Sequence, residues 1–120
     1  MTRYFLSLAY PAEVWADASE SDREAMHQAH LDFDRAARER VMIVAAEALA
    51  STDTATTVRH VGGRPQLTAG PFAESAEVVG GFYLLDADNL DDVVELCDLL
   101  PHSYVIEIRP VVQVEGFDHT

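Results

Sequence analysis

Lysine is absent from this 120-residue chain, and all eight of its basic residues are arginine. Without lysine the chain has neither a Schiff-base amine nor the lysine of a nucleotide-binding P-loop. Cysteine occurs once, at Cys97, which rules out an internal disulfide and fits a reducing compartment. Cys97 falls on the apolar stripe of an expected helix, so a place in the core is favoured over a role as nucleophile.

Positive charge is scarce, because eight arginines stand against 21 acidic residues and leave a formal net charge of −13. Such a chain has too few cations to neutralise a row of phosphates, which argues against nucleic acid and against an anionic membrane surface as partners. It contains no apolar run of about 18 residues, and Met1 leads straight into a strand-like segment without a signal-peptide pattern. We therefore expect a cytoplasmic protein.

The hydrophobic pattern predicts an α+β domain over residues 1–114, with a short C-terminal tail at 115–120. Strands are expected at 3–10, 41–46, 78–86 and 104–114. Helices are expected from about Asp22 to Arg40, with Ser21 or Asp22 as the N-cap, and from Asp88 or Asn89 to Pro101. Two β-like runs flank Gly62 and Gly63, which predicts a hairpin with a tight turn over 56–68.

The order β-α-β, hairpin, β-α-β is typical of a ferredoxin-like protomer, an antiparallel sheet with two helices on one face. Two helices cover only one side of such a sheet. The long strands carry apolar residues on both sides, and an exposed apolar face of that size is usually an interface. The sequence therefore predicts a homodimer in which a second copy covers the open side.

Four pieces of the chain carry a family resemblance. The main one is the segment Leu67–Glu74 followed by Gly80–Tyr83; the others are Tyr4–Leu6, Glu47–Leu49 with Thr54–Arg59, and Glu107–Val111. Together they resemble the YCII-related proteins of the DGPF-domain type. The resemblance implies a dimeric α+β barrel and an association with an extracytoplasmic-function sigma factor. It also implies a His-Asp pair beside a pocket. The aspartate that gives the DGPF motif its name is Ala69 here.

His30 is the sharpest candidate for catalysis, because it lies at the edge of the apolar stripe of the first helix. Asp34 follows four residues later, so the two side chains can meet. A carboxylate beside the imidazole would fix the tautomer and raise the pKa of His30, as suits a general acid or base. The alternative is a partly buried structural histidine. His27, His30 and Asp34 also have metal-compatible spacing, but without a second ligand cluster no metal is expected.

The candidate binding residues lie on strands and on one turn. Gly70, Pro71, Phe72 and Glu74 form a rigid turn that either lines a pocket or places Phe72 in the core. Arg59 and Arg109 lie on strands, where an inward arginine binds a carboxylate-bearing ligand and an outward one makes an ordinary ion pair. Glu47 completes this set.

Two functions remain open. The first is a cofactor-free acid/base enzyme acting on a small organic substrate near His30, by isomerisation or elimination. The second is a non-catalytic ligand-binding or regulatory module. The sequence contains no G-x-S-x-G, G-x-G-x-x-G or P-loop motif, so serine hydrolysis, dinucleotide binding and nucleotide hydrolysis have no support.

Overall fold

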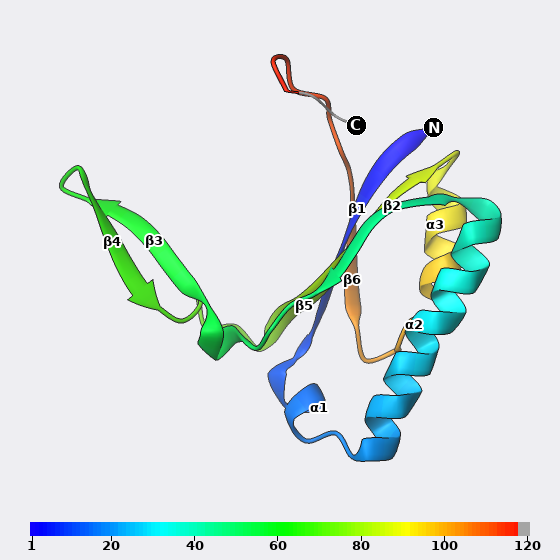
Figure 1. Cartoon of the computed structure of the whole chain (residues 1–120), viewed down its shortest axis with the longest axis horizontal. Coiled ribbons are helices and arrows are strands. Elements are labelled where there is room, and N and C mark those ends of the chain that lie inside the picture. The colour runs from blue at the N-terminus through cyan, green and yellow to red at the C-terminus, as the bar shows by residue number, and fades with distance from the viewer. Residues whose placement is uncertain (118–120) are drawn as a thin grey trace.

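A four-stranded antiparallel sheet forms the body of the protein in the order β2-β5-β1-β6 (Figure 1). The computed structural model describes residues 1–117. The sheet strands are β1 (Thr2–Pro11), β2 (Met42–Ala48), β5 (Glu77–Ala87) and β6 (Val105–Pro110). This order and the helices on one face confirm the predicted ferredoxin-like α+β fold. The sheet of the single chain is open, and no barrel is closed within residues 1–117.

Two helices cover one face of this sheet, α2 (Glu20–Arg40) and α3 (Leu90–Cys97) (Figure 1). A short helix, α1 (Ala12–Ala16), and a 3-10 turn, η1 (Thr52–Thr54), complete the helical elements of the described residues. Asn89 caps α3, since its side chain accepts a hydrogen bond from the backbone N–H of Asp92. Within residues 1–117, no helix is both long and apolar enough to cross a membrane.

Helix α2 begins two residues earlier than the sequence predicted, because the cap is Ser19. Its hydroxyl accepts from the backbone N–H of Asp22 at 3.1 Å, and the Asp22 carboxylate accepts from the backbone N–H of Ser19 at 3.1 Å. This reciprocal capping box satisfies two donors at once, whereas a cap at Ser21 or Asp22 would satisfy one. The predicted capping residue Asp22 is thus part of the cap, but in its N3 position.

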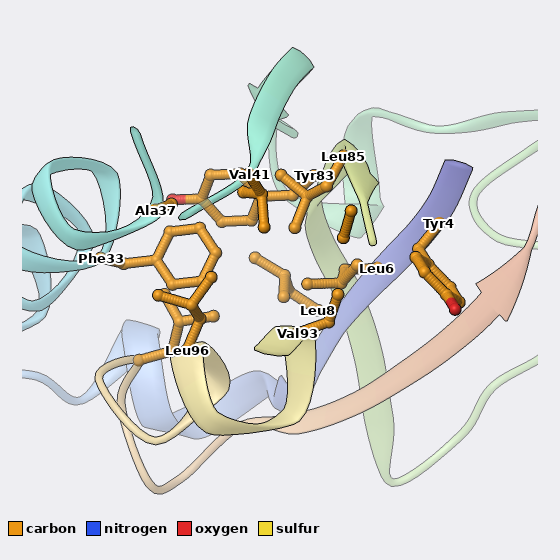
Figure 2. Close-up of a cluster of buried hydrophobic side chains, with 12 residues drawn as sticks. Tyr4, Leu6, Leu8, Phe33, Ala37, Val41, Tyr83, Leu85, Val93 and Leu96 are labelled. Atoms are coloured by element: carbon orange, nitrogen blue, oxygen red, sulfur yellow. The ribbon is translucent and has the colours of Figure 1, made fainter. Parts of the chain in front are cut away.

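The core lies between the helices and one face of β1 and β5 (Figure 2). Leu6 and Leu85 from the sheet, Phe33 from α2 and Val93 from α3 are completely buried. The Phe33 ring packs 4.5 Å, between centroids, from the ring of Tyr83. Cys97 is half-buried beside this core, and burial raises the pKa of its thiol to about 11. It is therefore a packing residue rather than a thiolate nucleophile.

The predicted hairpin is confirmed as β3 (Thr56–Val61) and β4 (Arg64–Ala69), but it does not join the main sheet. It forms its own two-stranded sheet and projects far from the body (Figure 1, green). Gly62 and Gly63 have φ of 58° and 76°, the left-handed conformation that a type I′ turn requires at both central residues.

The last strand is shorter than predicted and ends at Pro110 rather than at 114. Its partner explains the difference: Pro110 is paired with Tyr4, so β1 has almost no residues left beyond that point. One further backbone bond, from the Val111 N–H to the Arg3 carbonyl, closes the ladder. Of the expected tail at 115–120, positions 118–120 lie outside the described residues.

Candidate functional site

A cavity of about 790 Å³ opens between the first half of α2, the short helix α1 and one end of the sheet. Its walls come from the end of β1, from α1 and α2, from β2 with the loop to η1, and from β5. The volume falls within the range of small-molecule sites, roughly 300–1,000 Å³. Much of the lining is apolar, and its large aromatic and aliphatic side chains include Leu8, Tyr10, Trp15, Met26, Val78, Tyr83 and Tyr104.

His30 lines this cavity and is held between two tyrosine hydroxyls. Its Nδ1 lies 2.7 Å from the Tyr83 hydroxyl, and its Nε2 lies 2.9 Å from the Tyr104 hydroxyl. Tyr83 comes from β5, Tyr104 directly precedes β6, and His30 reaches down to both from α2. Helix and sheet therefore meet in one hydrogen-bonded chain, which we call the Tyr83–His30–Tyr104 network.

Counting hydrogens shows what this network can offer a ligand. A neutral imidazole carries one N–H and each phenol one O–H, so three hydrogens serve two hydrogen bonds. If Tyr104 donates to Nε2, then Nδ1–H donates to Tyr83, and the hydrogen of Tyr83 remains available. In the other tautomer the hydrogen of Tyr104 remains available. One phenol donor is thus left over in either tautomer, and both phenols line the cavity.

Burial sets the protonation states of this network. It lowers the pKa of His30 below the usual 6.5, and the charge of nearby His27 adds to the effect. Burial likewise raises the pKa of Tyr83 to about 12, with smaller contributions from the charge of Asp34 and from Tyr104. Burial also raises the pKa of Tyr104. At neutral pH the network is therefore an uncharged imidazole between two uncharged phenols.

Asp34 does not bind His30 as the sequence suggested. Its carboxylate accepts a hydrogen bond from the Arg38 Nε at 2.9 Å, one turn further along α2. The expectation of a raised pKa at His30 is wrong, because both ring nitrogens meet neutral phenols and desolvation is the largest effect. The charge of Asp34 reaches the site only indirectly, by raising the pKa of Tyr83.

Tyr10 covers the network from the side of β1. Its ring stacks on the ring of Tyr104, with centroids 5.4 Å apart and an interplanar angle of 25°. It can lie there because residue 80 is glycine: a Cβ at Gly80 would collide with the phenol end of Tyr10. A register shift between Leu8 and Ala9 accompanies this close approach, with one extra residue on β5.

Trp15 and Arg23 form another wall of the cavity. The Arg23 guanidinium carbon lies 4.7 Å from the centroid of the Trp15 ring, and its Nη2 donates to the Trp15 carbonyl at 3.2 Å. This pair ties the short helix α1 to the start of α2. Arg23 is the arginine among the lining residues, so it is the group there that can meet an anionic substituent.

Of the candidate binding residues, only Glu47 lines the cavity with His30. Arg59 lies on the projecting hairpin and donates to the Phe72 carbonyl at 2.8 Å. Phe72 itself is 76% exposed, so the alternative in which it fills the core is wrong. Arg109 is exposed on β6, opposite Phe5 of β1. The structure thus separates most of this set from His30; Asp34, Gly70, Pro71 and Glu74 also lie outside the cavity lining.

The hydrogen bonds of α2 also bear on whether its side chains could bind a metal ion. His27, His30 and Asp34 share α2, but both His30 nitrogens and the Asp34 carboxylate already have hydrogen-bond partners. Among residues 1–117, no three histidine, cysteine, aspartate or glutamate side chains gather in a way that could hold a metal ion.

Sequence reasoning missed the tyrosines of the site. The signal was present, since Tyr83 and Tyr104 fall on the helix-facing sides of their strands by simple alternation. A buried tyrosine needs a partner for its hydroxyl. His30 was the polar residue on the facing side of α2, so the sequence pattern could have predicted its hydrogen bonds to the two tyrosines.

Comparisons with known proteins identify relatives of the chain. A family model described as the YCII-related domain matches residues 4–115. A curated relative, an uncharacterised protein of Rhizobium meliloti (strain 1021), is 37% identical over 67 residues. That match covers 52% of this chain and 54% of the relative, so the chain spans about half of the relative's length.

Proposed function

The chain belongs to the YCII-related family, and from this premise we propose that it is a cofactor-free acid/base enzyme acting on a small organic substrate. The observation that carries the proposal is the Tyr83–His30–Tyr104 network at the wall of the 790 Å³ cavity. An uncharged imidazole that faces two phenols can take up a proton and pass one on without a cofactor.

The arrangement suits proton abstraction next to a carbonyl group. In the tautomer where Tyr104 donates to Nε2, the Tyr104 oxygen accepts a substrate C–H proton while its own hydrogen moves to Nε2. The electron pair of the C–H bond moves to the carbonyl oxygen, where the free hydroxyl hydrogen of Tyr83 stabilises the charge. Return of the proton to a neighbouring carbon gives an isomer, and loss of a leaving group gives elimination.

The lowered pKa of His30 supports its role as the proton acceptor from Tyr104, because it keeps the imidazole unprotonated at neutral pH. In this mechanism the tyrosine oxygens touch the substrate and His30 acts through them. Asp34, which binds Arg38, acts only through its charge on Tyr83.

The lining indicates the class of substrate. Tyr10, Trp15 and Met26 offer flat or flexible apolar surface, while the network offers one hydrogen-bond donor. We therefore favour a small, mostly apolar carbonyl compound, aromatic or unsaturated. Arg23 and Glu47 lie at other parts of the wall and allow one further polar substituent.

The experiment follows deuterium exchange into phenylacetone and 2-tetralone in D₂O by proton NMR. Both are aromatic ketones with acidified C–H bonds next to the carbonyl. The wild-type protein should exchange these hydrogens faster than the protein-free buffer. His30→Gln should lower the protein-dependent rate by roughly a hundredfold, in the usual range for general acid–base catalysis.

His102→Gln is the matched control, because His102 lies after α3 with its side chain 79% exposed and is not among the cavity-lining residues. This variant should exchange as the wild type does. Equal rates in the wild-type protein and His30→Gln, or no protein-dependent exchange with either ketone, would contradict the proposal. Circular dichroism checks that each variant is folded.

The alternative is a ligand-binding or regulatory module, such as one that works with a sigma factor. One observation favours it: both ring nitrogens of His30 already have partners, as in a structural histidine. Ketone-induced NMR shifts at Tyr83 and Tyr104 without any deuterium exchange would support this module over the enzyme.

A homodimer through the open side of the sheet remains part of the proposal. On that side Phe5 stacks on Phe82 with ring centroids 5.5 Å apart, and Val79 and Val105 are each about half exposed, at 48% and 54%. Both valines face Ala9 in register, so they form one apolar row across three strands. A second copy is the partner that this surface fits.

A further inference from the structure

The hairpin of residues 56–69, which we call the arm, stands clear of the rest of the chain (Figure 1). Every residue of the arm except Thr57 is exposed. The radius of gyration of the chain is 16.5 Å, whereas a compact domain of this length has about 14 Å. An isolated two-stranded hairpin is marginally stable in water, so an arm of this kind needs a surface to pack against.

The arm has two different faces. Opposed residues of a hairpin share a face, so Val58 and Leu67 lie together on one side, next to Pro65. These side chains are apolar and bare: Val58 is 55% and Leu67 69% exposed. On the other side, Arg59 lies opposite Gln66 and Arg64 opposite Val61.

The charge of the arm is opposite to that of the body. It carries Arg59 and Arg64 and no acidic residue, and no aspartate or glutamate occurs anywhere between Asp53 and Glu74. The rest of the chain holds the other six arginines and all 21 acidic residues, a formal charge of −15. Two copies of such a body repel each other, and the arm is the segment whose charge opposes that repulsion.

The arm is also held in shape before any partner arrives. At its base, the Gly70 N–H donates to the Ala55 carbonyl at 2.7 Å, and the Thr57 hydroxyl donates to the Gly70 carbonyl at 2.8 Å. Arg59 adds its bond to the Phe72 carbonyl. A preformed arm loses less conformational entropy on docking than a loose loop of the same length.

We propose that the arm docks on a second copy of this chain, which contacts both faces of the arm: the Val58–Leu67 face packs against apolar surface of that copy, and the opposite face, with Arg59 and Arg64, meets its carboxylates. The charge complementarity between arm and body selects a second copy over other partners. The proposal adds a contact to the sheet-to-sheet dimer and is independent of the acid/base activity. It predicts an association that is partly electrostatic, unlike the packing of two apolar sheet faces.

Sedimentation equilibrium of the full chain tests this. The wild-type protein should be a dimer at micromolar concentration, and R59E/R64E should raise the dimer dissociation constant at least tenfold at about 0.05 M salt. This difference between the two proteins should shrink as salt rises to about 0.5 M, since salt screens exposed charges.

R35E/R38E is the matched control, because it reverses the same number of charges on exposed arginines of α2. It should dimerise as the wild type does. A second arm variant, V58T/L67T, puts a residue with high β-propensity at both positions and reduces their apolar surface without changing the charge. It should weaken the dimer at every salt concentration.

Three results would overturn the proposal: a wild-type protein that stays monomeric, arm variants that dimerise like the wild type, or a control that loses the dimer as R59E/R64E does. If the arm variants still dimerise, the sheet-to-sheet contact alone is sufficient to hold the dimer. Ketone exchange, measured on the same samples, reads the acid/base activity separately.

Discussion

The phenol ring of Tyr10 occupies the space that a side chain at Gly80 would need. β1 and β5 are neighbours here, and the absent side chain allows the ring of one strand to lie across the other. From that position Tyr10 stacks on Tyr104, whose hydroxyl binds His30. A single glycine thus fixes the aromatic side of the candidate site.

We predict that Gly80→Ala displaces Tyr10. The colliding atoms are the far end of a side chain that can swing away, so the expected loss of stability is about 1 kcal/mol, at the lower end for overpacking. The larger effect should be the loss of the stack on Tyr104. Urea unfolding measures the first effect, and ketone-induced NMR shifts at Tyr104 measure the second.

A double-mutant cycle with Tyr10→Ala isolates this contact. Once the ring is gone, the alanine at position 80 meets no phenol, so the two changes together should cost less than their sum. Strict additivity of the two free-energy changes would show that the ring and residue 80 do not compete for the same space.

The fold was largely predictable because local patterns and the global arrangement agree. Alternation along residues 3–10 puts Leu6 and Leu8 on the same face of a strand, which is the buried one, and Gly62 with Gly63 marked the hairpin turn. The site was less predictable, because hydrogen bonds of His30 span 53 and 74 positions of sequence. The i to i+4 spacing offered Asp34 as a partner, but Arg38 has the same spacing from Asp34 and carries the opposite charge.

The start of α2 gives a second prediction. Ser19→Ala removes the hydroxyl that accepts from the Asp22 N–H and should lower the free energy of unfolding by about 1 kcal/mol. Ser21→Ala is the comparison, because Ser21 lies inside the helix and touches the cap only through its hydroxyl, 3.1 Å from the Ser19 hydroxyl, so it should cost less stability than Ser19→Ala. Chemical denaturation compares the two, and a larger loss in Ser21→Ala would place the cap where the sequence alone had put it.

The pH dependence of stability reports the protonation of His30. Folding lowers the pKa of this group, so the unfolded chain binds a proton more readily than the folded one. Above the usual value of 6.5 both states are neutral and His30 contributes nothing. As the pH falls below 6.5 toward the lowered folded pKa, the unfolded state gains a proton first, and the wild type should lose stability.

The comparison is with His30→Gln, which has no titratable group at that position. The free energy of unfolding of the wild type minus that of the variant should fall as the pH is lowered from 7.5 to about 5.5, across the usual histidine range. A difference that rises on acidification would mean a raised pKa, as the His30–Asp34 pair required. NMR titration of the His30 ring gives the same sign independently.

The two tyrosines of the network should not be equivalent. Tyr83 is 7% exposed and packs against Phe33, whereas Tyr104 is only partly buried. Tyr83→Phe leaves Nδ1 of His30 without its partner at the more buried end of the network, which should cost about 1–3 kcal/mol. Tyr104→Phe leaves Nε2 facing the cavity, where water can replace the hydroxyl, so its cost should be smaller.

Ketone exchange should rank the two variants the other way round if Tyr104 carries the proton. Tyr104→Phe should then lose the exchange activity while it keeps most of its stability. Equal effects of both variants on stability and on exchange would show that the network is symmetric and that neither phenol has a separate role.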